Sequence, residues 1–580
     1  MYKFTLCLKY LLKRALAYFA MLGVLVCVFL MLTCVAVLTG FVNKIEVAAK
    51  GLFGDIVISS ASLSGLGEYD ELIARIKKDV PEVEDASPFI LTFGILQLPG
   101  SDFRRTVQLA GIRLPERARV SDFAKGLFVQ QGLQEPTFDP PEPLILRRLD
   151  EDDKRTFKIL ERVAGLPFSG DPMRYRQAVA DKISMGAASG LTPDRQALAE
   201  RLLNATGFQD QAIEHFRNAK ETARRVAELQ AQIQAADEAG DETKRDLLER
   251  QKAAVERALI LPPDRRAILG LGIAGLSFRT PKGEIVRVIG PGQQIVLSMI
   301  PLGRQFSYAD ITPVTRNFTV IDDCSTDVSS IDSEIVYVPF DTLQELCNMG
   351  AQRTAGDANA IVEPARCSQI HVKLKEAPGL SRAESLRRVS DVARQVDAVW
   401  AVFQKTHPDA ARSSVAVETW RQRQSQLITM IESQRTLMVL ILGIISGVAI
   451  VLIFVILYVI VVQKTRDIGV LKAVGASNLG VAGIFLAYGG AIGLVGSILG
   501  TLAGCAVVWN INPIHDWVGR TFGFQVWNRE SFLFDKIPNQ VEPGTVLWIV
   551  TGAIIAGVFG SLLPALIAAM RQPVEALRYE

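Results

Sequence analysis

The feature that most constrains the fold is a set of four long apolar blocks that contain no Lys, Arg, Asp or Glu. A helix needs about 20 apolar residues to cross a hydrocarbon core roughly 30 Å thick. One charge at the centre of such a helix would cost about 2.5–3.5 kcal/mol. The four blocks are therefore predicted to be transmembrane helices, with bounds 15–40, 436–462, 481–508 and 545–570.

The first block has a second interpretation as a secretory signal, because four basic residues precede it: Lys3, Lys9, Lys13 and Arg14. Its apolar run exceeds the roughly 7–15 residues of a signal core, and no A-x-A-like cleavage site follows before Asn43. We interpret it as a retained anchor. Residues 1–14 suit either an interfacial helix on the inner leaflet or a basic flank that fixes topology.

Basic residues near the ends of the spans predict the orientation. They occur in segments 1–14, 463–480 and 571–580, and cytoplasmic loops carry such an excess. We therefore expect a multi-pass membrane protein whose N- and C-termini are cytoplasmic. The large segment 41–435 and the short loop 509–544 would then lie on the outer side, called the periplasmic side below.

The segment 41–435 predicts a large α+β domain, because strand and helix patterns alternate along it. From about 131 to 261 a helical pattern interrupts them, with apolar residues at steps of three and four. This pattern predicts an antiparallel coiled-coil hairpin that turns at Ala239–Asp241. The helical pattern suits either a packed hairpin or an arm that holds a partner. The strand patterns on either side indicate one discontinuous domain.

No motif indicates that the chain is an enzyme. The sequence lacks a G-x-x-x-x-G-K-[ST] phosphate loop, and the cytoplasmic segments are too short for a nucleotide-binding domain. Any ATP would be bound by a partner subunit, so we expect no cofactor here. Gly270, Gly272 and Gly275 form a G-x-G-x-x-G without the βαβ context that a dinucleotide requires. The four scattered histidines and the lack of a CxxC pair predict no metal site.

Three cysteines lie in the predicted periplasmic domain, namely Cys324, Cys347 and Cys367. They allow one disulfide at most and leave at least one free thiol. A formal net charge of +2 does not favour a nucleic-acid partner.

The third block carries two sets of glycines at four-residue spacing: Gly489 and Gly493, and then Gly496, Gly500 and Gly504. Small residues at i and i+4 share one helix face and allow close helix packing in lipid. We expect this packing against the second block or a second subunit, although glycine is also common in membrane helices. The loop 509–544 is rich in Trp and Phe, which suits interfacial anchoring or lipid contact.

Two segments resemble a known family. KTRDIGVLKAVGAS (464–477) and LPALIAAMRQPVEALRYE (563–580) are similar to the FtsX/MacB superfamily of ABC-transporter permeases, and within it to the lipoprotein-releasing (LolC/LolE-type) permeases. GFVNKI (40–45), VQLAGI (107–112) and the run from Phe318 to Leu346 extend the resemblance into the large domain.

The resemblance implies a permease that forms a homodimer or heterodimer and binds a cytoplasmic ABC ATPase dimer. It implies a type VII (MacB-like) transporter that couples ATP hydrolysis to periplasmic work, above all release or export of a lipoprotein or lipid. The alternative is a mechanotransmission complex that regulates a cell-envelope enzyme or an efflux assembly without moving cargo. Further partners would be membrane lipid and a periplasmic protein or lipoprotein, but no nucleic acid.

The resemblance also assigns roles to individual residues. The coupling helix docked on the ATPase would contain Lys464, Arg466, Asp467, Ile468, Gly469, Val470, Leu471, Lys472 and Gly475. The C-terminal tail at the same interface would contain Pro573, Glu575, Ala576, Leu577 and Arg578. The segment from about 131 to 261 departs from the family pattern, so the cargo and the partner of this insert stay open.

Overall fold

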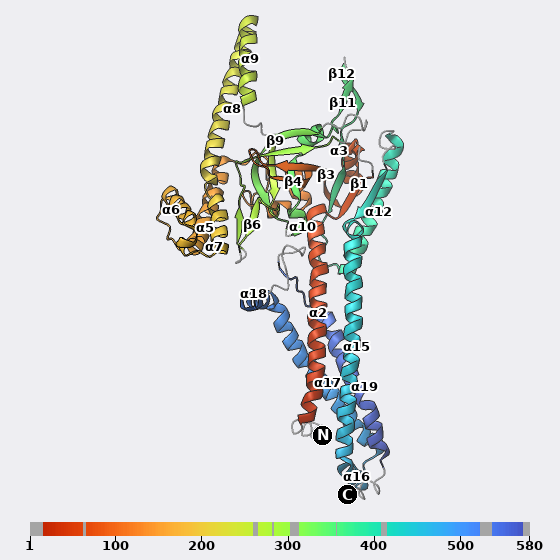
Figure 1. The fold of residues 1–580 in the computed structure, drawn as a ribbon. Helices are drawn as coiled ribbons and strands as arrows, with labels where there is room; N and C mark the ends of the chain where they lie inside the picture. The colour runs from red at the N-terminus through yellow and green to blue at the C-terminus, as the bar shows by residue number, and fades with distance from the viewer. Residues whose placement is uncertain are drawn as a thin grey trace. The chain divides into compact units, whose positions relative to one another are not determined.

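The structure is a computed structural model, and it divides into two compact units (Figure 1). It describes residues 15–61, 65–258, 265–280, 284–301, 313–326, 328–354, 357–407, 414–522 and 536–571. One unit, called the membrane unit below, combines Met1–Val47 with Gln424–Glu580. The other, called the sheet unit, comprises Ala48–Arg423.

Four helices of the described residues are long and apolar enough to cross a membrane, which confirms the predicted number of spans. They are α2 (Ala15–Phe53), α15 (Ser425–Gln463), α17 (Asn478–Trp509) and α19 (Pro543–Met570). α2 and α15 are longer than the apolar blocks, because polar helix-forming residues continue each helix beyond the part that hydropathy identifies. Among its described residues this unit also has two short helices, α16 (Thr465–Ala473) and α18 (Ile511–Phe522).

The spans pack through side chains that recur at helical spacing. Val24, Val28 and Leu32 of α2 lie in one buried cluster with Ile453 and Leu457 of α15. Tyr488 and Ile492 of α17 belong to the same cluster. The membrane unit therefore has its own apolar interior, formed by residues far apart in the sequence.

The sheet unit is built on nine strands in the order β15-β1-β14-β3-β4-β10-β5-β9-β8. Their bounds are β1 Ile56–Ser60, β3 Val83–Gln97, β4 Arg104–Ile112, β5 Arg266–Gly270, β8 Gln294–Met299, β9 Val314–Cys324, β10 Ile335–Pro339, β14 Gln369–Leu374 and β15 Val415–Thr419. β8 also pairs with β3, so the strands from β3 to β8 close into a ring. Strands from before the insert (β1, β3 and β4) are flanked in this order by strands from after it, so the two parts form one discontinuous domain.

Short strands and helices complete the sheet unit. The strands are β2 Leu66–Gly67, β6 Ser277–Arg279, β7 Ile285–Arg287, β11 Gln352–Thr354, β12 Asp357–Glu363 and β13 Arg366–Cys367. The helices are α3 Tyr69–Asp79, α4 Leu114–Val120, α10 Ser329–Asp332, α11 Phe340–Leu346, α12 Arg382–Thr406 and α14 Trp420–Arg423, with the 3₁₀ turns η1 Asp122–Gly126 and η2 Gly186–Ser189. A capping box of Ser381 and Glu384 starts α12.

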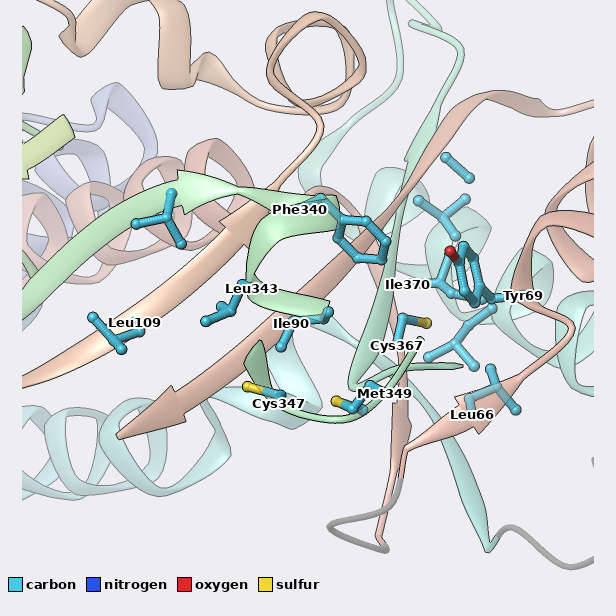
Figure 2. Packing of buried hydrophobic residues seen from close by; sticks show 14 of the residues in the cluster. Leu66, Tyr69, Ile90, Leu109, Phe340, Leu343, Cys347, Met349, Cys367 and Ile370 are labelled. Atoms are coloured by element: carbon cyan, nitrogen blue, oxygen red, sulfur yellow. The ribbon is translucent and has the colours of Figure 1, made fainter. Parts of the chain in front are cut away.

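The main core of the sheet unit lies between the strands and the helices α3, α11 and α12. Figure 2 shows part of it, where Leu343 of α11 lies near Ile90 and Leu109 of the sheet. Leu343 comes within 3.0 Å of the position that a Cβ on Gly111 would occupy. A side chain at residue 111 would therefore push α11 away from the sheet.

The three cysteines of this unit are buried and free. Cys347 and Cys367 lie in the main core, whereas Cys324 lies in a separate apolar cluster with Phe123 and Tyr337. The disulfide that the sequence allowed is not formed. Burial raises the pKa of Cys347 to about 12, so this thiol is a poor nucleophile.

The helical insert has five helices: α5 Glu142–Ala164, α6 Pro172–Ser184, α7 Pro193–Asn204, α8 Phe208–Glu238 and α9 Glu242–Ala258. α8 and α9 pack through Leu229, Ala236 and Leu248, and the turn between them falls at the predicted residues. The description of this pair as a coiled coil stays a prediction. α5, α6 and α7 form a further small core that the sequence analysis did not separate from the hairpin.

Buried charges attach the insert to the sheet. The carboxylate of Asp322 on β9 accepts backbone N–H groups from Phe128 (3.1 Å), Val129 (2.7 Å) and Gln130 (3.1 Å), which precede the insert. Arg287 on β7 forms ion pairs with Asp152 of α5 and Asp323 of β9. The first helix of the insert is thus joined to the sheet through a nearly buried guanidinium.

Asp322 makes the stability of the protein depend on pH. Burial raises the pKa of Asp322 to about 7, although its backbone N–H donors oppose the shift. The unfolded chain releases this proton near pH 3.9, so between about pH 4 and pH 7 the folded state binds more protons and stability falls as pH rises. We expect wild type to lose up to about 4 kcal/mol relative to Asp322→Asn between pH 4 and pH 8, measured by denaturant unfolding in detergent.

The control for this experiment is Asp102→Asn, because Asp102 is exposed. Asp102→Asn removes one exposed carboxyl and leaves the contacts of Asp322 in place. A difference between wild type and Asp322→Asn that is equal at both ends of the range would contradict a raised pKa at this carboxyl.

Candidate functional site

The charged loop between the second and third spans folds into the short helix α16, which follows α15 after a break at Lys464 (Figure 1). Gly475 ends the helix with φ +105°, a left-handed conformation that favours glycine. The Ser477 hydroxyl then accepts the N–H of Gly480 at 3.1 Å and caps the start of α17. Two tight turns therefore fix α16 between two spans.

The inner side of α16 packs against three spans. Ile468 is buried in a cluster with Val461 of α15, Val481 of α17 and Ala568 of α19. Thr465 and Gly469 are also buried. The Lys472 ammonium donates to the carbonyl oxygens of Ala569 (2.5 Å) and Arg571 (2.8 Å) at the end of α19. A cation at the C-terminal end of a helix interacts favourably with its dipole.

The outer side of α16 is exposed and combines charge with apolar surface. Arg466 and Asp467 are exposed, and Asp467 forms an ion pair with Lys464. Val470 is 48% exposed, and Val474 in the following turn is 84% exposed. An exposed apolar surface beside fixed charges is typical of a site where another protein binds.

A small cavity of about 30 Å³ lies beside α16. Its lining residues come from α15, α16 and α17 and are Ile460, Lys464, Asp467, Ile468, Leu471, Val481, Ile484, Phe485 and Tyr488. A cavity of this size holds about one water molecule and no nucleotide.

Two of the predicted packing glycines contact α19. A Cβ on Gly489 would lie 2.4 Å from the Ser561 side chain and 2.6 Å from the carbonyl oxygen of Gly557. A Cβ on Gly493 would lie 2.9 Å from the carbonyl oxygen of Ala553. The backbones of α17 and α19 therefore approach too closely for any side chain at these positions.

The other three glycines contact α2. Cβ atoms on Gly496, Gly500 and Gly504 would lie 2.9 Å or less from atoms of Val24, Leu25 and Leu32, respectively. The sequence analysis expected the second block or a second subunit on this face, whereas the structure places the first and fourth spans of the same chain there. α15 instead contacts α19 at Gly560 and α2 at Gly23.

The structure brings the predicted coupling residues together but does not describe all of the predicted site. Lys464 to Gly475 form α16 and the turns at its ends. The five tail residues lie outside the described part of the chain: Pro573, Glu575, Ala576, Leu577 and Arg578. The contact of Lys472 with the end of α19 was missed, since no sequence spacing reveals it.

Other sequence motifs have structural explanations. Gly270 and Gly272 lie against the backbone of Asp332 and Ser333, and Gly275 adopts φ +92° beside Phe103. These glycines permit close chain packing in the sheet unit. In the described residues no group of three His, Cys, Asp or Glu side chains could hold a metal ion.

Comparison with known proteins finds a family that part of the membrane unit resembles. Residues 439–573, which include α16, α17 and α19, match the FtsX-like permease C-terminal family. The chain carries an FtsX-like permease domain.

The related proteins are ABC-transporter permeases. The lipoprotein-releasing system transmembrane protein LolC of Neisseria meningitidis is 24% identical over 321 residues, which cover 55% of this chain and 66% of that protein. LolC of Xylella fastidiosa is 27% identical over 164 residues, 28% of this chain and 40% of that protein. The macrolide export ATP-binding/permease protein MacB of Chlorobaculum tepidum is 31% identical over 125 residues, 22% of this chain and 16% of that protein.

These relatives confirm the resemblance to the FtsX/MacB superfamily and, within it, to the LolC/LolE-type permeases. The matched part of the chain spans less than two thirds of the length of each of the three relatives. With the four spans, the relatives indicate a protein of the inner membrane.

The glycine contacts of the permease domain lead to a stability prediction. Gly489→Ala should destabilise the protein by about 1–3 kcal/mol, because the new methyl group has no space against α19. The matched control on the same helix is Gly483→Ala, where a Cβ would meet nothing within 4 Å. Thermal unfolding in detergent compares the two variants. Equal stability of the two variants would contradict this close packing.

Proposed function

We propose that the chain is the permease subunit of a type VII (MacB-like) ABC transporter and that α16 is its docking site for a cytoplasmic ATPase dimer. One observation carries this proposal: α16 is fixed on its inner side to three spans by Ile468 and Lys472, while Arg466 and Val470 stay exposed. A displacement applied to the outer side is therefore passed to the spans. The ATP would be bound by the partner subunit, so the chain needs no cofactor of its own.

Thermodynamic linkage determines how ATP binding can change the conformation of the permease. A ligand can shift a conformational equilibrium only by its different affinity for the two states. ATP would therefore have to favour one arrangement of the ATPase dimer, and that dimer one arrangement of two α16 helices. This requires two permease subunits, either identical or different. The termini and α16 would all face the cytoplasm.

The work most consistent with the relatives is release of a lipoprotein or lipid from the outer leaflet of the inner membrane. LolC is named for a lipoprotein-releasing system, and the match to it extends over 321 residues, 55% of this chain. The sheet unit would then be periplasmic, where it meets the cargo or a carrier protein.

A second function is favoured by the helical insert, namely mechanotransmission to an envelope enzyme or efflux assembly without transfer of cargo. The pairs that Arg287 forms with Asp152 and Asp323 join the insert to the sheet through buried charges. A rigid attachment suits an element that passes movement to a partner.

Charge reversal on α16 tests the docking proposal. Arg466→Glu should abolish most of the stimulation of ATPase activity by the permease, because a carboxylate replaces an exposed cation at the proposed interface. Lys536→Glu is the matched control, since it reverses another exposed charge of the membrane unit, between α18 and α19. The measurement is ATP hydrolysis by the reconstituted complex. Unchanged stimulation in Arg466→Glu would contradict docking at α16.

Removal of the insert distinguishes the two functions. Deleting residues 131–261 removes Asp152 and leaves Arg287 paired with Asp323 alone. Asp152→Asn, which breaks the same ion pair and keeps the insert, is the control. Lipoprotein release from spheroplasts that persists, together with misregulated cell-wall hydrolysis, would support mechanotransmission. Loss of release with normal hydrolysis would support the releasing function.

A further inference from the structure

The short helix α18 lies in the connection between the third and fourth spans, and no motif of the permease match assigns it a role. It begins two residues after α17 ends at Trp509. Large apolar side chains on and beside it are exposed: Trp509, Ile514, Trp517 and Phe522, with exposed fractions of 72%, 39%, 57% and 69%. His515, Val518 and Gly519 are less exposed, and the rings of Trp517 and Phe522 lie 6.2 Å apart, so they form one exposed aromatic surface.

Hydrogen bonds fix α18 beside the ends of the spans. The amide side chain of Asn512 donates to the carbonyl oxygen of Ile537 at 3.2 Å and accepts the Ile537 N–H at 2.9 Å. The side chain of Asn539 donates to the carbonyl oxygen of Val508 on α17. The chain that leads into α19 therefore holds the base of α18 against the end of α17.

The same connecting segment also contacts the first span. The backbone N–H of Gln540 donates to the carbonyl oxygen of Ala36 at 3.1 Å, and its side chain accepts a hydrogen bond from Asn43. A Cβ on Gly40 would lie 2.7 Å from the backbone nitrogen of Asn539. The ends of two apolar blocks and the start of a third are thus tied together at the level of α18. This level corresponds to the boundary between hydrocarbon and water.

We propose that α18 is an in-plane helix whose Trp517 and Phe522 face inserts among phospholipids at the edge of the hydrocarbon core. The occupant is lipid because the face is continuous with spans that are themselves surrounded by lipid. Trp has an apolar ring and an N–H donor, and it concentrates at this depth in membrane proteins. Asp516 is exposed beside Trp517 and marks the side that faces water.

The lipid-facing surface of α18 would fix the depth of this helix in the membrane. An in-plane helix resists displacement along the membrane normal, because withdrawing two aromatic rings from the lipid exposes apolar surface to water. α18 would therefore hold α17 and α19 at constant depth while other segments move. The inference requires only that the spans lie in a membrane and is independent of ATPase docking at α16.

Spin labels on adjacent residues test the proposal. The full chain, carrying a nitroxide at Trp517→Cys or at Asp516→Cys, is reconstituted in vesicles of phosphatidylethanolamine and phosphatidylglycerol. Collisions with oxygen, which dissolves in lipid, are compared with collisions with a water-soluble nickel chelate. The label at 517 should favour oxygen several-fold, whereas the label at 516 should favour nickel. Protein without an introduced cysteine gives the background of the native thiols.

Two outcomes of the labelling would overturn the inference. Equal access of nickel to both labels would place the helix in water. Protection of the 517 label from both reagents would show that a second copy or another protein covers the face.

A second measurement avoids introduced cysteines. Trp517→Phe should lower the fraction of tryptophan emission that brominated phospholipids quench, whereas Trp420→Phe, which removes a ring buried in the sheet unit, should not lower it. Quenching of Trp517→Phe equal to that of wild type would also overturn lipid contact at this ring.

Discussion

The pairing of β1 with β15 is the constraint on which the rest of the sheet unit depends. The chain enters this unit from α2 through β1 and leaves it from β15 through α14 into α15. The two strands run antiparallel, with Ile56 opposite Thr419 and Ser60 opposite Val415. Because neighbouring strands lie about 4.8 Å apart, the entry and exit of the whole unit are held side by side at one edge of the sheet. A movement of α2 relative to α15 would place force on the pairing of β1 with β15.

Side chains around this pair strengthen it. Arg117 is buried, donates to the carbonyl oxygen of Leu52 in the last turn of α2 and contacts the ring of His371 on β14. Burial lowers the pKa of Arg117 to about 10, and burial together with this neighbouring cation lowers the pKa of His371 well below its usual value. The histidine is therefore neutral and can accept the hydrogen bond. Directly after β15, the side chain of Trp420 is buried, and the backbone N–H of Trp420 donates to the carbonyl oxygen of Asp55 at 3.1 Å. The end of α2 and the end of β15 are thus fixed to the same sheet.

Elements that a repeating pattern of apolar residues defines were predictable from the sequence. Which elements pack against one another was not predictable. The apolar blocks revealed four spans, and the turn at residues 239–241 was read from the break in helical spacing. Four-residue glycine spacing predicts a shared face but not what covers it. Gly489 and Gly493 contact α19, whereas Gly496, Gly500 and Gly504, which follow further along α17 on much the same face, contact α2. The closure of β8 on β3 and the bonds of Asp322 join segments about 200 residues apart, and no local pattern contains that information.

The close packing of the membrane helices has a mechanical consequence. Where α17 meets α19 and α2, glycines bring backbones so close that one helix cannot slide past another without a clash of main-chain atoms. Packed interfaces of this kind move as bodies and do not deform continuously. α16 is attached to the same body by Ile468 and by Lys472 at the end of α19. Under the proposed docking, a force on α16 would be carried by the spans as a unit, and α2 continues from the membrane unit into the sheet unit as far as Phe53. This arrangement suits a protein that does its work away from the site where energy enters, because little movement is lost within the spans.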